Sequence, residues 1–412
     1  MPVATHSEPA HRVEFDLADP EVQRDPYPTY ARLRRHEPLA HRSEETFESW
    51  VITRYDDCLA LLRDPRLSSA RQIGDLQNPG VPEKFRRLGQ MLGHMMLQKD
   101  DPDHSRLRGL VNKAFTPRVV ERLRPRVETI VDHLLGVVMS RGRGEMDVIR
   151  DLATPLPVIV IAELLGVPTN DQGRFKKWSD DIAVVLDGSV REAGLPDAAQ
   201  SAYELGEYLR GVVAERRKQP REDLISRMIA ARDDERALSD DELVANCVLI
   251  LLAGHETTTN LIGNGALALL RHPDQLALLR REPALATNVV EECLRYDPPV
   301  QLTSREPLED VAYRDFRFEK GVELNLMFGS ANRDEEVFEG GDRFDVRRAN
   351  ASSHLSFGHG AHFCLGSTLA RLEGEVAFRA LATRMSRIEL DGEPPRRAGL
   401  VIRGLSALPV RF

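Results

Sequence analysis

The stretch FGHGAHFCLG, residues 357–366, is the most informative part of this 412-residue chain. It places Cys364 in a glycine-rich loop, two residues after a histidine and directly before a helical pattern. Backbone N–H groups, a helix N-terminus and nearby positive charge all favour the thiolate form of a cysteine. A thiolate with neither a second cysteine nor a catalytic base beside it is most useful as a metal ligand. The loop therefore predicts that Cys364 binds a metal.

Other interpretations of the loop come from its glycines and histidines. The G-x-G at 358–360 could open a dinucleotide-binding fingerprint, but Phe363 stands where the third glycine belongs. His359, His362 and Cys364 could supply three zinc ligands, yet no second cysteine or histidine pair lies at zinc-finger spacing. For the loop taken alone, a buried structural cysteine is the default alternative.

The order F-x-x-G-x-H-x-C-x-G resembles the cysteine-ligand loop of the cytochrome P450 family. All five defining positions match: Phe357, Gly360, His362, Cys364 and Gly366. The resemblance implies that Cys364 ligates the iron of haem b, a ligation that favours O–O cleavage, and that His362 contacts a haem propionate. Phe357 would exclude water from the sulfur, and the two glycines would let the backbone approach the flat macrocycle.

A long helix is expected from residue 239 onward. The sequence SDDE at 239–242 is a capping box, and about 30 residues of helical pattern follow it. At 1.5 Å per residue such a helix is roughly 45 Å long, enough to cross a domain of this size. Residues 246–253 are apolar except for Asn246, so the middle of this helix is predicted to be buried.

The sequence AGHETTT, residues 253–259, lies within the same helix. Charge and hydroxyls inside a buried helix are costly unless they serve chemistry or are well satisfied. The Thr257 hydroxyl can bond back to the carbonyl of Ala253, which bends a helix and would open a groove beside Gly254. A zinc-protease motif is excluded because Thr259 stands where the second histidine belongs. A helix kinked only for packing is the other interpretation.

This segment matches the oxygen-binding signature A-G-x-[DE]-T-T of the same family. The resemblance implies that Thr257 and Glu256 are catalytic, with Thr257 stabilising reduced oxygen at the iron and Glu256 relaying protons. It also implies that Ala253 and Gly254 make room for O₂ over the haem. His255 occupies the variable position of the signature, and its role is left open.

The sequence ECLR places Glu292 and Arg295 three residues apart on one helical face. Such pairs are usually solvated and of small energetic value. Here YDPP, residues 296–299, ends the helix, which matches the E-x-x-R helix of the family. The resemblance implies a buried structural pair that a residue from a later loop completes. Arg343 is the candidate, although the family often has proline where this chain has Gly341.

Further cations match positions at which the family binds haem propionates. The stretch DPDHSRLR, residues 101–108, resembles a family helix start, and His104 and Arg108 share one face of that helix. Arg305 matches another contact. With His362 these side chains provide four donors for two carboxylates, and charge-assisted bonds of this sort allow an anionic cofactor to be buried.

Composition favours a soluble, cytoplasmic protein. The 56 Lys and Arg against 65 Asp and Glu give a net charge of −9, which argues against nucleic acid as a partner. Four widely spaced cysteines indicate a reducing compartment rather than a disulfide framework. The longest apolar run, residues 247–254, is far shorter than the roughly 18 residues that span a bilayer. We therefore expect no membrane partner.

No linker or repeat divides the chain. Helical patterns dominate from residue 116 to about 300, and strand-like pieces gather near both ends, so the residues alone indicate a large, mainly helical α+β domain. The resemblance implies the single-domain P450 fold over residues 26–412, with haem between two central helices and small sheets at one side. Residues 1–25 are expected to be a flexible extension, and the protein to be a monomer.

By family position, the segments 71–97, 249–253, 300–303 and 400–402 would line the substrate pocket. Their residues are mostly apolar, so a hydrophobic or amphipathic substrate is expected. The individual candidates are Met95, Leu249, Ala253, Val300, Leu302 and Val401.

The resemblance implies a haem-thiolate monooxygenase that inserts one atom of O₂ into a small molecule, by hydroxylation or epoxidation, in secondary metabolism. No flavin or iron–sulfur motif is present, so electrons are expected from a ferredoxin and its ferredoxin reductase. Arg106, Lys113 and Arg118 are candidates for a basic docking patch near Cys364. Two alternatives stay open: a peroxide-driven or isomerising haem-thiolate enzyme, and a non-catalytic haem-binding protein.

Overall fold

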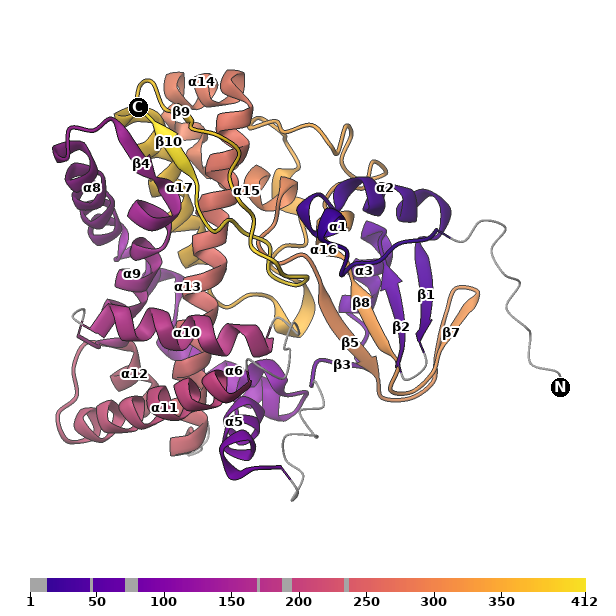
Figure 1. Ribbon diagram of the computed structural model, residues 1–412. Coiled ribbons are helices and arrows are strands. Elements are labelled where there is room, and N and C mark those ends of the chain that lie inside the picture. Colours follow the sequence, from indigo (N-terminus) through magenta and orange to yellow (C-terminus); the bar gives the residue numbers. More distant parts are fainter. Residues whose placement is uncertain (1–12, 45–46, 71–80, 169–170, 187–194, 233–236) are drawn as a thin grey trace.

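A long central helix organises the fold (Figure 1). Helix α13 (Asp240–Arg271) begins at the capping box that the sequence predicts. The Ser239 hydroxyl accepts the backbone N–H of Glu242 at 3.2 Å, and the Glu242 carboxylate accepts the N–H of Ser239 at 2.9 Å. These two bonds satisfy N–H groups that a helix start leaves without partners.

The structure, a computed structural model, describes residues 13–44, 47–70, 81–168, 171–186, 195–232 and 237–412. Helices predominate in these ranges, as the sequence predicts. Besides α13, the α-helices are α1 (Pro20–Arg24), α2 (Tyr27–His36), α3 (Tyr55–Leu62), α5 (Glu83–Gly93), α6 (Asp103–Ala114), α7 (Pro117–Glu121), α8 (Arg124–Ser140), α9 (Pro155–Leu165), α10 (Gln172–Leu186), α11 (Leu195–Lys218), α12 (Leu224–Ala230), α14 (Pro273–Arg281), α15 (Ala286–Tyr296), α16 (Phe328–Ala331) and α17 (Ser367–Arg384).

Three small sheets accompany the helices. The largest has the strand order β1-β2-β8-β5-β3, in which β2 and β8 are parallel and the other neighbours are antiparallel. A three-stranded sheet has the order β4-β10-β9, and β6 pairs with β7. The strands are β1 (Leu39–Glu44), β2 (Phe47–Ile52), β3 (Leu67–Ser68), β4 (Glu145–Asp147), β5 (Thr303–Pro307), β6 (Val311–Tyr313), β7 (Phe316–Phe318), β8 (Glu323–Leu326), β9 (Glu389–Leu390) and β10 (Pro409–Arg411).

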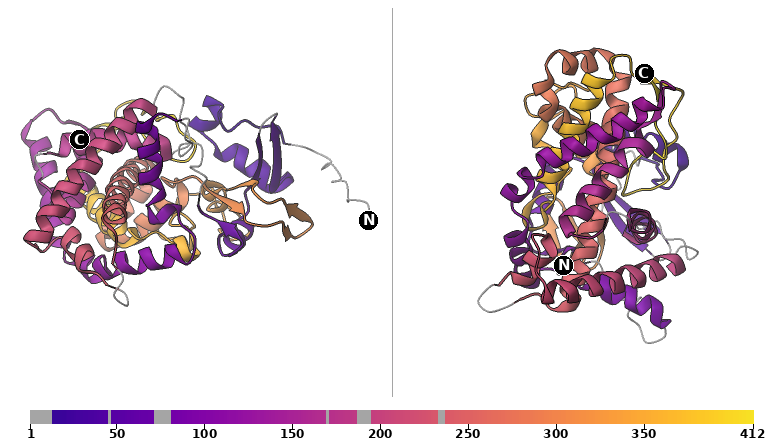
Figure 2. Two further views of the ribbon diagram at one scale, coloured as in Figure 1. Left: turned by 90° about the horizontal axis from the view of Figure 1, so that it is seen from below. Right: turned by 90° about the vertical axis from the view of Figure 1, so that its left-hand side faces the viewer.

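The five-stranded sheet lies to one side of the helical part, as Figure 1 and the view from below in Figure 2 both show. Each part has its own apolar core. The larger core lies among the helices around α13 and includes Trp178 and Phe378. The core of the sheet includes Trp50, Phe318 and Leu324. Burying a side chain of this size stabilises the fold by about 1.5–3 kcal/mol.

Residues 13–25 of the expected N-terminal extension contact the rest of the chain, while its flexibility stays a prediction. Val13, Phe15 and Leu17 pack against a third apolar cluster that contains Tyr27. The guanidinium of Arg42 lies 3.9 Å from the centroid of the Phe15 ring. The alternation of apolar and polar residues over 13–17 is the sequence signal for this packing. Residues 1–12 lie outside the described part.

The sequence predicts neither a disulfide framework nor a membrane-spanning segment. All four cysteines are free thiols in the described chain. Over the described ranges, none of the helices is both long enough and apolar enough to cross a membrane.

Candidate active site

The cysteine loop requires a glycine at its centre. Gly360 begins a short 3₁₀ turn with a φ of +75°, a conformation that side chains disfavour. A Cβ atom at this position would lie 2.9 Å from the carbonyl oxygen of Leu62, so α3 also leaves no room for one. The backbone N–H of Cys364 donates to the carbonyl of Phe357 at 2.8 Å, which closes the loop. The sulfur is thereby placed just before α17.

The surroundings of the Cys364 sulfur act on its charge in two directions. Burial raises the pKa of the thiol, and this effect is the largest. The backbone N–H groups of Gly366 and Ser367, together with the guanidinium groups of Arg108 and Arg371, lower it. The net direction is upward, although the N–H groups and positive charges that the sequence predicts do favour the thiolate form. A bound metal cation would complete the deprotonation, because a coordinating thiol loses its proton.

Phe357 is held in place by a neighbour that the sequence reasoning missed. The ring is buried, and the guanidinium of Arg371 lies 4.5 Å from its centroid. Arg371 in turn pairs with Glu291 at 2.6 Å, and Glu291 lies 3.2 Å from His354. One arginine therefore both orients the shielding ring and adds positive charge near the sulfur. Nothing in the spacing of Arg371 distinguishes it from other arginines of α17.

The four predicted propionate donors come together. The rings of His104 and His362 are in contact, with centroids 3.9 Å apart and planes tilted by 32°. The pKa of His362 is lowered to about 4, chiefly by burial and in addition by the charges of His104, Arg305 and Arg108. Arg108, from α6, also donates to the Phe363 carbonyl at 2.7 Å. Three separate segments, α6, β5 and the cysteine loop, thus supply one basic cluster.

This cluster fits the two carboxylates of haem b. His104 is 3 % exposed, and its Nδ1 atom makes no hydrogen bond within the described residues. The carboxylate of Asp101 lies 3.8 Å from this atom. An anion here would offset the positive charge of Arg108 and Arg305, and a carboxylate could accept a hydrogen bond from the His104 ring. The donors and the sulfur of Cys364 therefore suit an anionic macrocycle that carries a metal cation.

The threonine of the α13 motif adopts the predicted arrangement. The Thr257 hydroxyl donates to the Ala253 carbonyl at 2.6 Å, which confirms the predicted back-bond. Ala253 is exposed although its neighbour Leu252 is buried, and burial resumes at His255, so the buried part of the helix is interrupted at Ala253. A Cβ atom on Gly254 would lie 3.2 Å from Ile161, so this glycine also permits close packing with α9.

The two ionisable residues of the motif have different environments. Glu256 pairs with Arg397, whose Nη1 atom lies 3.0 Å from the carboxylate. His255 is buried, and neither ring nitrogen makes a hydrogen bond within the described part of the chain. Burial lowers the pKa of His255 to about 4, with Asp180 raising it and Lys176 lowering it. Both of these residues belong to α10, so His255 faces that helix as a neutral ring.

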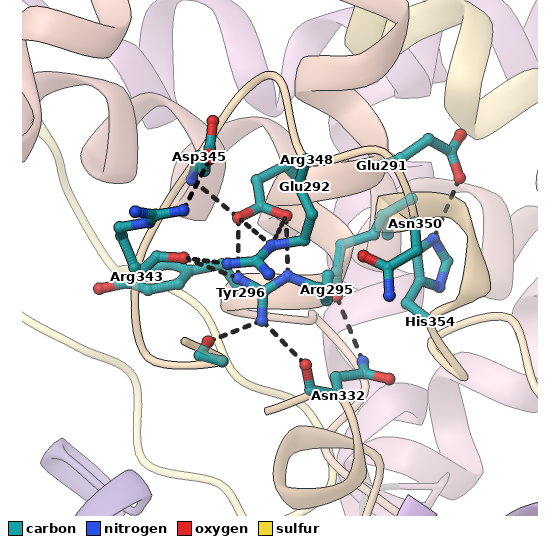
Figure 3. Close-up of polar contacts among 12 residues, drawn as sticks. Glu291, Glu292, Arg295, Tyr296, Asn332, Arg343, Asp345, Arg348, Asn350 and His354 are labelled. Carbon is teal, nitrogen blue, oxygen red and sulfur yellow. Dashed lines mark hydrogen bonds and ion pairs between the residues drawn. The ribbon is translucent and has the colours of Figure 1, made fainter. Parts of the chain in front are cut away.

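The E-x-x-R pair is buried as the resemblance implies (Figure 3). Glu292 and Arg295 are both fully buried and share two bonds of 2.7 Å. Arg343 is not the third member, which corrects the sequence prediction: its side chain is 73 % exposed and pairs with Asp345 at 3.1 Å. Arg348 takes the position, with its Nε atom 3.3 Å from the Glu292 carboxylate.

A local turn explains the correction. The backbone N–H of Arg348 donates to the Asp345 carbonyl, and this turn brings Arg348 back toward α15. Only the backbone carbonyl of Arg343 enters the network, where it accepts bonds from Arg295 and Arg348 at 3.0 Å each. Gly341 is also explained, because a Cβ atom there would collide with the carbonyl of Arg333.

The candidate pocket residues lie on segments that are paired with one another. Val300 bridges to Ile402, and the N–H of Gln301 donates to the Val401 carbonyl at 2.8 Å. Met95 precedes Met96, whose N–H donates to Asn246 of α13 at 3.0 Å. Met95, Leu249 and Leu302 are buried, whereas Val300 and Val401 are partly exposed. Residues 71–80 of the predicted lining lie outside the described residues.

Comparisons with known proteins agree with this geometry. A family model described as "Cytochrome P450" matches residues 72–387. The chain is 42% identical over 402 residues to "Cytochrome P450 107B1" of Saccharopolyspora erythraea, covering 95% of this chain and 96% of that one. It is 40% identical over 408 residues to the "6-deoxyerythronolide B hydroxylase" of the same organism, covering 96% and 98%. A solved structure of P450BioI with hexadec-9Z-enoic acid ligated acyl carrier protein has a TM-score of 0.89 at 37% identity, covering 95% and 99%.

Substitutions of Arg348 and Arg343 should destabilise the protein to different extents. Arg348→Ala should lower the free energy of unfolding by about 3 kcal/mol, because it removes one partner of a buried ionic network. The matched Arg343→Ala should change it by less than about 0.5 kcal/mol, since only an exposed side chain is lost. Urea denaturation of the haem-free and haem-loaded proteins measures both. Equal destabilisation by the two substitutions would contradict the assignment of Arg348.

Proposed function

Because the chain belongs to the cytochrome P450 family, whose members are haem-b monooxygenases, we propose that it hydroxylates or epoxidises a hydrophobic small molecule of secondary metabolism. The observation that carries this proposal is the placement of Cys364 at the start of α17, beside the basic cluster of His104, Arg108, Arg305 and His362. Haem, when bound, supplies thiolate-ligated iron at which O₂ is reduced and split. The chain supplies binding, orientation and protons.

The residues around the sulfur would hold the haem and tune it. Cys364 would provide the ligand to the metal, and the N–H groups of Gly366 and Ser367 would stabilise negative charge on its sulfur. Phe357 would keep water from that atom. The basic cluster would bind the propionates and so orient the cofactor.

Protons for the reaction would pass through α13. The hydrogen of the Thr257 hydroxyl is directed at the Ala253 carbonyl, which leaves the oxygen free to accept a hydrogen bond. Glu256 is next in the chain and only partly buried, so its carboxyl group can exchange protons with solvent. A carboxyl group and a hydroxyl group in this order suit general acid catalysis.

The substrate would be large and mostly apolar. The relatives named above include a hydroxylase of 6-deoxyerythronolide B and a P450 solved with a hexadecenoyl chain on its carrier protein. In this chain the candidate lining residues Met95, Leu249, Val300, Leu302 and Val401 are all apolar. An apolar pocket of this kind selects by shape and size more than by hydrogen bonds.

Electrons would come from a ferredoxin with its ferredoxin reductase. The predicted docking patch needs one correction: the Arg106 guanidinium is paired with Glu242, so its charge is largely neutralised. Lys113 and Arg118 are exposed. The Phe363 ring, next to Cys364 in sequence, is 40 % exposed and offers an apolar centre to a docking protein.

Replacing the proposed ligand tests the haem assignment. Cys364→Ser should fold and still bind haem through the basic cluster, but its reduced carbon monoxide complex should lose the absorption band of a thiolate ligand. Absorption spectra of the two reduced proteins measure this. A thiolate spectrum that persists in the variant would exclude Cys364 as the ligand.

Substrate class and electron source are tested together. Titration of the haem-loaded protein with macrolides, steroids, terpenes and fatty acids should give a saturable shift of the haem absorption with at least one class. With that ligand, oxidation should require O₂, a ferredoxin and its reductase, and should slow at high salt because docking is partly electrostatic. Product formation with peroxide alone, at an equal rate, would favour the peroxide-driven alternative.

If Thr257 is catalytic, its removal should separate electron consumption from product formation. Thr257→Ala should retain haem and substrate binding, while product formed per electron pair should fall at least about tenfold as hydrogen peroxide is released instead. Thr259→Ala is the control, because the Thr259 hydroxyl donates to the Ala153 carbonyl and not toward the motif. Full coupling in Thr257→Ala would remove this residue from the proton path.

A further inference from the structure

The carboxylate of Glu256 is held by a residue that is distant in sequence. Arg397 lies near the C-terminus, and its Nη1 atom is 3.0 Å from the Oε1 atom of Glu256. The Glu256 side chain is 13 % exposed and that of Arg397 is 40 % exposed. Water therefore screens this pair only in part, so the guanidinium can fix both the position and the charge of the carboxylate.

The segment that carries Arg397 is fastened to α13 and α15. The N–H of Arg397 donates to the Gly404 carbonyl at 3.1 Å, and Arg396 pairs with Asp297 at 3.0 Å. Gly404 packs so closely on Asn260, one helical turn after Glu256, that a Cβ atom would collide with the amide. The starting point of the Arg397 side chain is therefore fixed relative to the acid that it binds.

The other charged groups described near this part of α13 have different surroundings. His255 is buried, and the charges of Asp180, Lys176 and Arg397 act on it. Lys176 and Asp180 of α10 pair with each other. The ion pair of Arg397 with Glu256 therefore joins the C-terminal segment to the motif of α13.

We propose that Arg397 is a positioning residue for Glu256. The inference rests on the proposed function, because it needs Glu256 to relay protons. Release from Arg397 lets the carboxylate take up the proton that it must pass on.

The proton affinity of Glu256 tests this without turnover. Infrared spectra of the haem-loaded ferric protein, recorded against pH, contain the C=O stretch of the protonated carboxyl group, identified by its loss in Glu256→Gln. A carboxylate beside a guanidinium has a lowered pKa, so Arg397→Gln should move the midpoint of this band upward by about one pH unit. Arg397→Lys should keep the midpoint close to that of the unmodified protein, because the positive charge is retained.

A matched control is Arg384→Gln, which removes a similarly exposed guanidinium and its ion pair with Asp132 on α8; it should leave the midpoint unchanged. An unchanged midpoint in Arg397→Gln would overturn the proposal. A further outcome is that the midpoint moves in Arg397→Gln while Glu256→Gln still forms product with every electron pair. That result would exclude Glu256 as a proton relay but would support the positioning role of Arg397. If Glu256→Gln loses product per electron pair and the midpoint is the same with and without Arg397, only the positioning proposal is wrong.

Discussion

The structure depends on one electrostatic constraint: a buried group is charged only if an opposite charge stays beside it. Burial raises the pKa of the Cys364 thiol and lowers that of the His362 imidazole, so the protein alone holds both groups near neutrality. These opposite shifts are complementary to one cofactor. A metal cation at the sulfur and carboxylates at the histidine would each supply the missing partner. The loop and the basic cluster thus form one binding site for a group with a cationic centre and an anionic edge.

The position of the sulfur is set by a second buried network. The carbonyl of Leu294, between Glu292 and Arg295 on α15, accepts the Ser356 hydroxyl at 2.6 Å, and Ser356 directly precedes Phe357. Asn332 donates to the same hydroxyl at 2.8 Å and accepts the N–H of Leu355 at 2.7 Å. The Glu292–Arg295 pair therefore acts on the ligand loop through the backbone of α15. Because this pair is rigid, the start of the ligand loop has a fixed position before any cofactor binds.

Sequence reasoning succeeded where the determining contacts are local. The capping box of α13 and the bond from Thr257 to Ala253 both join residues within four positions, so their geometry follows from helix periodicity. It failed where a side chain chooses among distant partners. Arginines at 343 and 348 were equally available to Glu292, and only the turn after Asp345 decides between them. Likewise, nothing near Arg397 in sequence indicates that its partner is Glu256.

Two adjacent residues on α13 show why contacts between residues distant in sequence matter for function. His255 and Glu256 differ by one position, yet the His255 ring is enclosed against α10 while Glu256 pairs with a guanidinium that is 40 % exposed. Burial lowers the pKa of His255, which disfavours its protonated form. Moving the exposed side chain of Arg397 costs far less than moving a packed helix. Glu256 is therefore better suited than His255 to exchanging protons during turnover.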